Sequence, residues 1–138
     1  MKIAVFVSGR GSNLNAILNS HDLINLVEVI AVVSDKIDCK AFYIAKEFGI
    51  KTFIVGDGEG KIDQNEITSV LKNLGVNFIV LAGYLKLIPD DLIDKFKNRI
   101  INIHPALLPS FGGKGMYGIN VHRAVFNSSA KVSGATVH

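Results

Sequence analysis

The chain has 138 residues, a length typical of one domain, and its 49% hydrophobic residues suffice for a buried core. The net charge of +3 is mild and no basic run occurs, which suits small anionic ligands and does not indicate a nucleic-acid surface. The single Cys39 excludes an internal disulfide and no apolar run reaches membrane-spanning length. We therefore expect a cytoplasmic protein without nucleic-acid or membrane partners.

The first predicted strand is Ile3–Val7, a continuous apolar run typical of a strand buried on both faces of a parallel sheet. Gly9 and Gly11 allow a tight turn after it, and Ser12 or Asn13 is expected to cap the following helix. Backbone N–H groups at such a helix start attract phosphate. Gly11, Ser12 and Asn13 are therefore candidate phosphate-binding residues.

The same loop also resembles part of a dinucleotide-binding motif. Gly9 and Gly11 match the first two glycines of G-x-G-x-x-G, but Leu14 replaces the third glycine. Asp35, after the second predicted strand, could act as the acidic ribose ligand of such a site. Because the match is partial, we favour a monophosphate site over a nicotinamide site. A plain connector between strand and helix is the remaining alternative.

Strand and helix patterns alternate through the rest of the chain. Apolar runs predict strands, and apolar residues at helical spacing predict helices between them. The further strands are expected at Val27–Val33, Lys51–Val55, Phe78–Leu81, Ile100–His104 and Val132–His138. Asp63 and Glu66 form a candidate capping box for one helix, and Pro89 is expected to start the next. The alternation predicts a single doubly wound α/β domain over residues 1–138, with a mostly parallel open sheet.

Two polar residues stand at the end of the predicted strand Ile100–His104. Asn102 and His104 are two residues apart, so an extended chain directs both side chains to one face. Pro105 cannot donate to a strand ladder and should end the strand. Open α/β sheets bind ligands at the carboxyl ends of their strands, and an amide and an imidazole there suit stabilisation of an oxyanion. The alternative is a capping asparagine and a hydrogen-bonded histidine at a strand-to-loop corner.

Three segments, in chain order, resemble the folate-dependent formyltransferase family. Val7–Leu14 resembles the phosphate loop of the branch formed by the phosphoribosylglycinamide formyltransferases. Val80–Ile88 is similar to the V-L-A-G-[FY]-M-[RK]-I-L segment of that branch. Asn102–Pro109 resembles the family signature N-I-H-P-S-L-L-P, with Ala106 in place of serine. With the ending Gly134–His138, these matches span the whole chain.

The resemblance implies a Rossmann-like fold and a reaction of purine biosynthesis. In that reaction a formyl group passes from the co-substrate 10-formyltetrahydrofolate to the amine of glycinamide ribonucleotide. Asn102 and protonated His104 would stabilise the oxyanion, and His104 would then donate a proton to the departing folate nitrogen. By the same resemblance, the ribonucleotide phosphate would lie at Gly11, Ser12 and Asn13.

The resemblance also implies a folate pocket. Its expected lining residues are Leu85, Lys86, Leu87, Ile88 and Asn102. Lys61 lies near the position of a family arginine that contacts the folate, and a solvated lysine is the alternative there. No metal is expected, because the four histidines, His21, His104, His122 and His138, show no ligand spacing.

Two other functions stay open at this point. One is hydrolysis of the same folate, as in the formyltetrahydrofolate deformylases. The other is a non-catalytic fragment that binds a nucleotide or a folate. In the family a functional aspartate follows shortly after the histidine that corresponds to His138, where this sequence stops. We therefore expect the N-terminal, site-bearing part of a formyltransferase, with its C-terminal part missing, at most weakly active and prone to form homo-oligomers.

Overall fold

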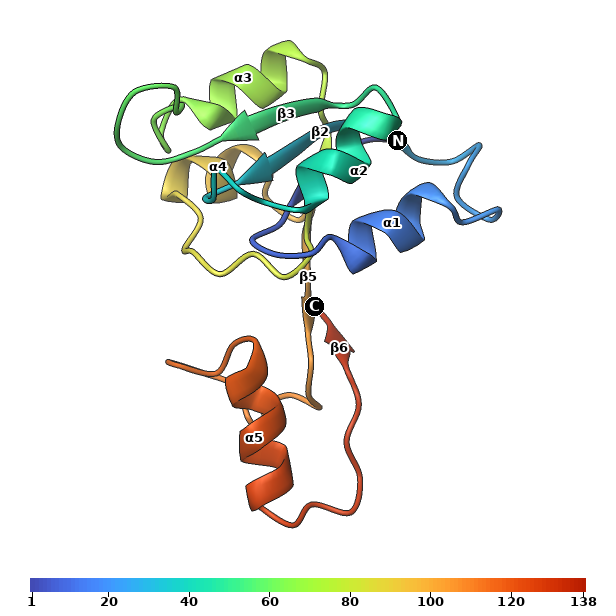
Figure 1. Ribbon diagram of the computed structural model, residues 1–138, viewed down its shortest axis with the longest axis vertical. Coiled ribbons are helices and arrows are strands. Elements are labelled where there is room, and N and C mark those ends of the chain that lie inside the picture. Colours follow the sequence, from blue (N-terminus) through green and yellow to red (C-terminus); the bar gives the residue numbers. More distant parts are fainter. The chain divides into compact units, whose positions relative to one another are not determined.

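The computed structural model describes residues 1–138, which form two compact units, Met1–Ile100 and Ile101–His138. The first unit contains four parallel strands in the spatial order β3-β2-β1-β4. Figure 1 labels β2 and β3 of these strands. These strands are β1 (Lys2–Phe6), β2 (Glu28–Ser34), β3 (Lys51–Ile54) and β4 (Phe78–Leu81). The helices between and after them are α1 (Ser12–Leu18), α2 (Ala41–Glu47), α3 (Ile67–Asn73) and α4 (Asp90–Lys95).

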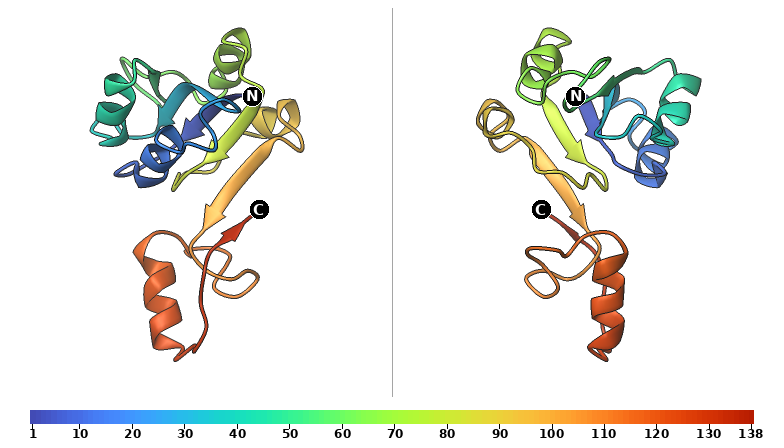
Figure 2. Two further views of the ribbon diagram at one scale, coloured as in Figure 1. Left: turned by 90° about the vertical axis from the view of Figure 1, so that its right-hand side faces the viewer. Right: turned by 60° about the vertical axis from the view of Figure 1, so that its left-hand side comes forward.

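Helices cover both faces of this four-stranded sheet. Figure 2 shows α1 and α2 on one side of the strands and α3 and α4 on the other. Successive residues of a strand point to opposite faces, so Ala4 and Phe6 of β1 join one apolar cluster and Val5 does not. Ile67 and Leu71 of α3 belong to that cluster, as do Leu92 of α4 and Phe96 directly after it, and all four are fully buried. The predicted doubly wound α/β architecture is confirmed for this unit.

The second unit contains all of β5 (Ile100–His104) after its first residue, together with α5 (Ile119–Asn127) and β6 (Thr136–Val137). Ile79 of β4 donates its N–H to the carbonyl of Arg99 at 2.9 Å, so within the first unit the chain approaches β5 beside β4. β5 pairs with β6 in antiparallel orientation, with Ile103 opposite Val137. Both Phe78–Leu81 and Ile100–His104 have the bounds predicted from the sequence.

The start of α1 differs from the prediction. Neither Ser12 nor Asn13 caps the helix; both lie inside it, and the N-cap is Gly11 with φ 78° and no side-chain hydrogen bond. A Cβ on Gly11 would lie 2.7 Å from Cβ of Ala41, so the glycine lets α1 start close to α2. The positive φ and this close approach both require glycine, which outweighs the usual preference for a polar cap.

The predicted capping box does not form, because the N–H of Glu66 bonds to the backbone carbonyl of Asp63 and not to its side chain. Asp63 Oδ1 accepts the N–H of Asn65 at 2.7 Å, which closes a turn before α3. Glu66 is the N-cap of α3 and makes no side-chain capping bond. Asp63 therefore stabilises the turn, and Glu66 does not return the bond that defines a capping box.

The predicted last strand is too long. The strand β6 covers only Thr136 and Val137, His138 adds one further backbone pair with Asn102, and Thr136 lies opposite His104. The next residue of β5 would be Pro105, which has no N–H to donate, so the ladder ends there. The Thr136 side chain instead donates to the carbonyl of Ala106 at 2.7 Å and accepts the N–H of Leu108 at 3.0 Å.

Among the helices, none has the length and apolar character needed to cross a membrane.

We expect Gly11→Ala to lower the free energy of unfolding by about 1–3 kcal/mol, because the new Cβ meets α2 in a left-handed backbone conformation. Urea unfolding followed by circular dichroism measures this change. Gly9→Ala is the matched control, since a Cβ there meets nothing within 4 Å, and it should stay within about 0.5 kcal/mol of the original chain. Equal stability of the two variants would contradict the role given to Gly11.

Candidate functional site

The loop between β1 and α1 holds the predicted phosphate-binding residues. Gly11 is buried, Asn13 is partly buried and Ser12 is exposed, so backbone and side chains of the helix start reach solvent. Cys39 contacts this loop from the buried side, because its thiol lies 3.3 Å from the carbonyl oxygen of Gly9. Leu14, at the position of the missing third glycine, is fully buried and anchors α1 to the core.

A hydrogen-bonded group links this loop to two other strand ends. Ser8, which follows β1 and is buried, donates its hydroxyl to Oδ1 of Asp35 at 2.5 Å. The same hydroxyl oxygen accepts the N–H of Leu85 at 2.9 Å. Parallel strands end at the same edge of a sheet, which is why residues after β1, β2 and β4 meet here. Asp35, considered above as a ribose ligand, is thus engaged with Ser8.

Tyr84 lies next to this group. Its ring packs edge-on against Phe6, with 5.3 Å between ring centroids and 86° between the planes. Burial, assisted by the nearby Asp35 carboxylate, raises the pKa of Tyr84 from 10.0 to about 12. Both effects disfavour the phenolate, because removal from water penalises its charge and a like charge repels it. Tyr84 is therefore a neutral phenol at any physiological pH.

Four of the predicted folate-binding residues, Lys61, Lys86, Leu87 and Ile88, line two hollows of the first unit. Leu85 lines neither hollow, and Asn102 lies on β5 of the second unit. Lys61 and Lys86 line a pocket of about 290 Å³ together with Asp35 and Tyr84. The sequence placed Lys61 and Lys86 in separate segments, and the structure brings them to one pocket. Leu87, which is 90% exposed, and Ile88 border a second, more open hollow of about 520 Å³.

Four carboxylates face this second hollow, contributed by Asp57, Asp63, Asp90 and Asp91. Gln64 also lines it and donates its side-chain amide to the carbonyl of Leu87 at 2.6 Å. The Leu85–Ile88 segment is therefore held at one end by Ser8 and further along by Gln64.

The second unit holds the predicted catalytic pair. Asn102 and His104 alternate with apolar residues along β5, and both are partly buried. Asn102 exchanges backbone hydrogen bonds with His138, at 2.7 Å and 3.0 Å. Residues opposite one another in an antiparallel pair project to the same face, so His138 joins Asn102 and His104 on that face.

The hydrogen bonds of this pair decide which atoms are free. Nδ2 of Asn102 lies 3.0 Å from Nε2 of His138, so in this orientation one amide hydrogen is used and the other is free. Nε2 of His104 lies 2.9 Å from the carbonyl oxygen of Phe111. Because a carbonyl can only accept, that nitrogen carries a hydrogen. Nδ1 of His104 is thus the ring nitrogen that is left for a ligand.

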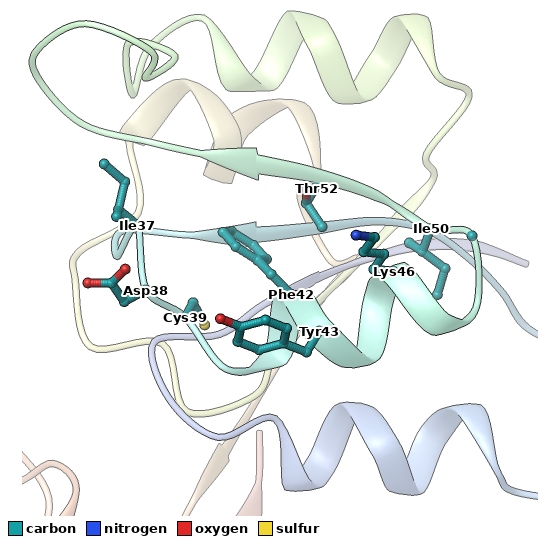
Figure 3. Close-up of a pocket in the computed structure, with 9 residues that line it drawn as sticks. Ile37, Asp38, Cys39, Phe42, Tyr43, Lys46, Ile50 and Thr52 are labelled. Carbon is teal, nitrogen blue, oxygen red and sulfur yellow. The ribbon is translucent and has the colours of Figure 1, made fainter.

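A further pocket, of about 430 Å³, lies between α2 and β3 and is bordered by Phe42, Tyr43 and Lys46 (Figure 3). None of the residues predicted to bind phosphate or folate lines it.

In the structure no three His, Cys, Asp or Glu side chains gather as a metal site would require.

Two contributors to these sites, Ser8 and His138, were missed from the sequence, and Asp35 was considered only as a ribose ligand. Ser8 and Asp35 bond across 27 residues, and His138 reaches Asn102 across 36 residues. The only sequence signal for Ser8 was a polar residue directly after a buried strand, which also describes many loop residues. For His138, the sequence predicted a last strand but not the strand that pairs with it. The contact between His138 and Asn102 could therefore not be predicted.

The family model and the related proteins that match this chain all belong to the formyltransferases. The formyl transferase family model matches residues 1–138. A chloroplastic phosphoribosylglycinamide formyltransferase of Arabidopsis thaliana is 46% identical over 143 aligned residues, which cover 99% of this chain and 49% of the relative. A phosphoribosylglycinamide formyltransferase of Haemophilus influenzae is 32% identical, with 99% and 64% covered. The chain therefore spans about half the length of the plant relative.

Solved structures show the same fold. The phosphoribosylglycinamide formyltransferase of Anaplasma phagocytophilum aligns with a TM-score of 0.84 at 32% identity, covering 100% of this chain and 63% of the other. The corresponding structure from Bacillus halodurans gives a TM-score of 0.84 at 31% identity, covering 100% and 71%.

Tyr84 provides a test of the electrostatics at the strand ends. Its raised pKa means that its contribution to stability is fully present below about pH 10 and is lost as the pH rises through about 12. We expect Tyr84→Phe to remove the phenolate absorbance that appears near pH 12, and to lessen the fall in stability between these pH values. Tyr43→Phe, at a 72% exposed tyrosine, should leave the absorbance change near pH 12 in place. A Tyr84 phenolate formed fully by pH 10 would contradict this account.

Proposed function

The chain belongs to the formyl transferase family, and on that premise we propose that it transfers a formyl group from 10-formyltetrahydrofolate to the amine of glycinamide ribonucleotide. The observation that carries the proposal is the pair of Asn102 and His104 on one face of β5, each with a hydrogen-bonding atom still free. The relatives named above support this choice of substrate, because their names state the same ribonucleotide class.

The proposed chemistry needs no covalent intermediate with the protein. The ribonucleotide amine forms a bond to the formyl carbon, and the formyl oxygen becomes an oxyanion. The free amide hydrogen of Asn102 and protonated Nδ1 of His104 stabilise that charge. The bond from the carbon to the folate nitrogen then breaks, and that nitrogen takes the proton from Nδ1 of His104. The attacking amine nitrogen gives its surplus proton to water, from which His104 is protonated again.

Binding of the two substrates is proposed for the loops of the first unit. The backbone N–H groups of Gly11, Ser12 and Asn13 would hold the ribonucleotide phosphate. Lys61 and Lys86 would attract the folate carboxylates, a role supported by their charge and their location in one pocket. Leu85, Leu87 and Ile88 would supply apolar contact, and Asn102 would contact the formyl end.

The location and assembly of this chain are further proposals. The plant relatives are named chloroplastic, whereas the cytoplasmic location proposed for this chain rests on its composition and single cysteine. Self-association would follow from apolar side chains exposed on the second unit, among them Phe126 at 85%.

An assay with and without the ribonucleotide separates the candidate functions. The 138-residue chain is incubated with 10-formyltetrahydrofolate, and formylated ribonucleotide and free tetrahydrofolate are both quantified by mass spectrometry. We expect tetrahydrofolate to appear only with the ribonucleotide and in equal amount to the formylated product. Release at the same rate without ribonucleotide would identify a deformylase, and binding of both ligands without turnover would identify a non-catalytic fragment.

We expect His104→Ala and Asn102→Ala each to lower turnover by about 100-fold or more, because each removes a donor to the oxyanion. Affinity for the ribonucleotide should change little, since its phosphate binds elsewhere. Matched controls are His122→Ala and Asn127→Ala, which remove the same side chains from exposed positions of α5. Near-normal turnover in either catalytic variant would show that the assignment is wrong.

A further inference from the structure

Ser8 occupies an unusual position among the polar residues of the first unit. It is only 3% exposed, yet it makes three hydrogen bonds to two separate segments of the chain. Its N–H donates to the carbonyl of Gly83 at 3.2 Å, and its hydroxyl oxygen accepts the N–H of Leu85 at 2.9 Å. The two bonds lie on either side of Tyr84, so Ser8 holds the chain both before and after that residue.

The direction of the hydroxyl hydrogen follows from its partners. A backbone N–H can only donate, so the Ser8 oxygen must accept from Leu85. The single hydroxyl hydrogen then points to the Asp35 carboxylate, with 2.5 Å between the two oxygens. A hydrogen bond to a charged acceptor is stronger than a neutral one. Asp35 therefore orients the hydroxyl so that a lone pair faces Leu85.

Ser8 takes over where the strand ladder ends. The N–H of Ala82 still donates to the backbone carbonyl of Phe6 at 2.8 Å, in the manner of a parallel pair. At Gly83, with φ 76°, the chain of β4 turns away from β1. The N–H of Leu85 therefore has no backbone acceptor in β1, and the hydroxyl oxygen of Ser8 accepts it instead.

We propose that Ser8 is a positioning residue that fixes the start of the Leu85–Ile88 segment relative to the phosphate-binding loop, with Asp35 orienting its hydroxyl. The inference rests on the proposed function, because it assigns the two linked segments to the two substrates. Formyl transfer requires the formyl carbon and the amine to meet at bonding distance, and a misplacement of about 1 Å can cost about 100-fold in rate. A direct bond between the two binding segments limits their independent motion.

The hydrogen bond itself is tested by amide exchange. We expect Ser8→Ala to accelerate hydrogen–deuterium exchange at the Leu85 N–H by at least about tenfold, measured by NMR of the labelled chain. Ser34→Ala is the matched control: Ser34 is also buried and adjoins Asp35, but its hydroxyl accepts the N–H of Lys36 at 3.1 Å. That variant should leave Leu85 protection unchanged. Unchanged protection in Ser8→Ala would overturn the inference.

Ligand binding tests the positioning role separately from folding. Calorimetric titration with 5-formyltetrahydrofolate, a stable folate, should show affinity about tenfold weaker in Ser8→Ala and unchanged in Ser34→Ala. Faster exchange at Leu85 with unaltered folate affinity would overturn the positioning role. If the unsubstituted chain binds no folate, the proposed function fails, and the positioning role of Ser8 fails with it. Hydrogen–deuterium exchange at Leu85 would still test the hydrogen bond between Ser8 and Leu85 by itself.

A second substitution covers the case in which Ser8→Ala does not fold. Ser8→Cys fills a similar volume with a much weaker acceptor, and it should give the same faster exchange and weaker folate binding. Ser8→Thr keeps the hydroxyl and should retain both properties of the original chain. Loss of Leu85 protection in Ser8→Thr, with the fold intact, would count against the hydroxyl as the cause.

Discussion

The first unit depends on the parallel pairing of β1 with both of its neighbours. β1 pairs with β2 on one side and with β4 on the other, so its backbone groups are satisfied within the sheet and its side chains are free to pack. This central position also sets where the loops go. The four strands of this unit run in the same direction, and the residues after β1, β2 and β4 therefore emerge at one edge.

The polar groups at that edge follow from the same constraint. A buried strand cannot continue its ladder once its neighbour turns away, and the unpaired backbone groups need other partners. Ser8 supplies one such partner for Leu85, and Asp35 satisfies Ser8 in turn. A site built in this way joins loop segments through one short side chain, which loses little conformational freedom when it is buried.

In the second unit, antiparallel pairing has the corresponding role. The pairing of β5 with β6 places His138 beside Asn102, and Thr136 opposite His104. Pro105 ends the ladder, and Thr136 then bonds to the chain that follows it. Backbone pairing thus gathers polar side chains on one face, where Asn102 and His104 keep hydrogen-bonding atoms free for a ligand.

The sequence by itself determined the order and type of the elements, because apolar periodicity and turn residues are local properties of the chain. It determined the bounds of Phe78–Leu81 and Ile100–His104 and the shared face of Asn102 and His104, since alternation along a strand needs no partner. Its motifs also indicated the formyl transferase family, which the comparisons show.

The tertiary structure alone decided the features that depend on distant residues. Gly11 begins α1 because Ala41 of another helix leaves no room for a side chain. Lys61 shares a pocket with Lys86, and His138 bonds to Asn102, through contacts between distant parts of the chain that local patterns do not encode. Ser8 and Leu85 are 77 residues apart in the chain. Only the folded sheet brings the Ser8 hydroxyl to the N–H of Leu85, which has no backbone partner.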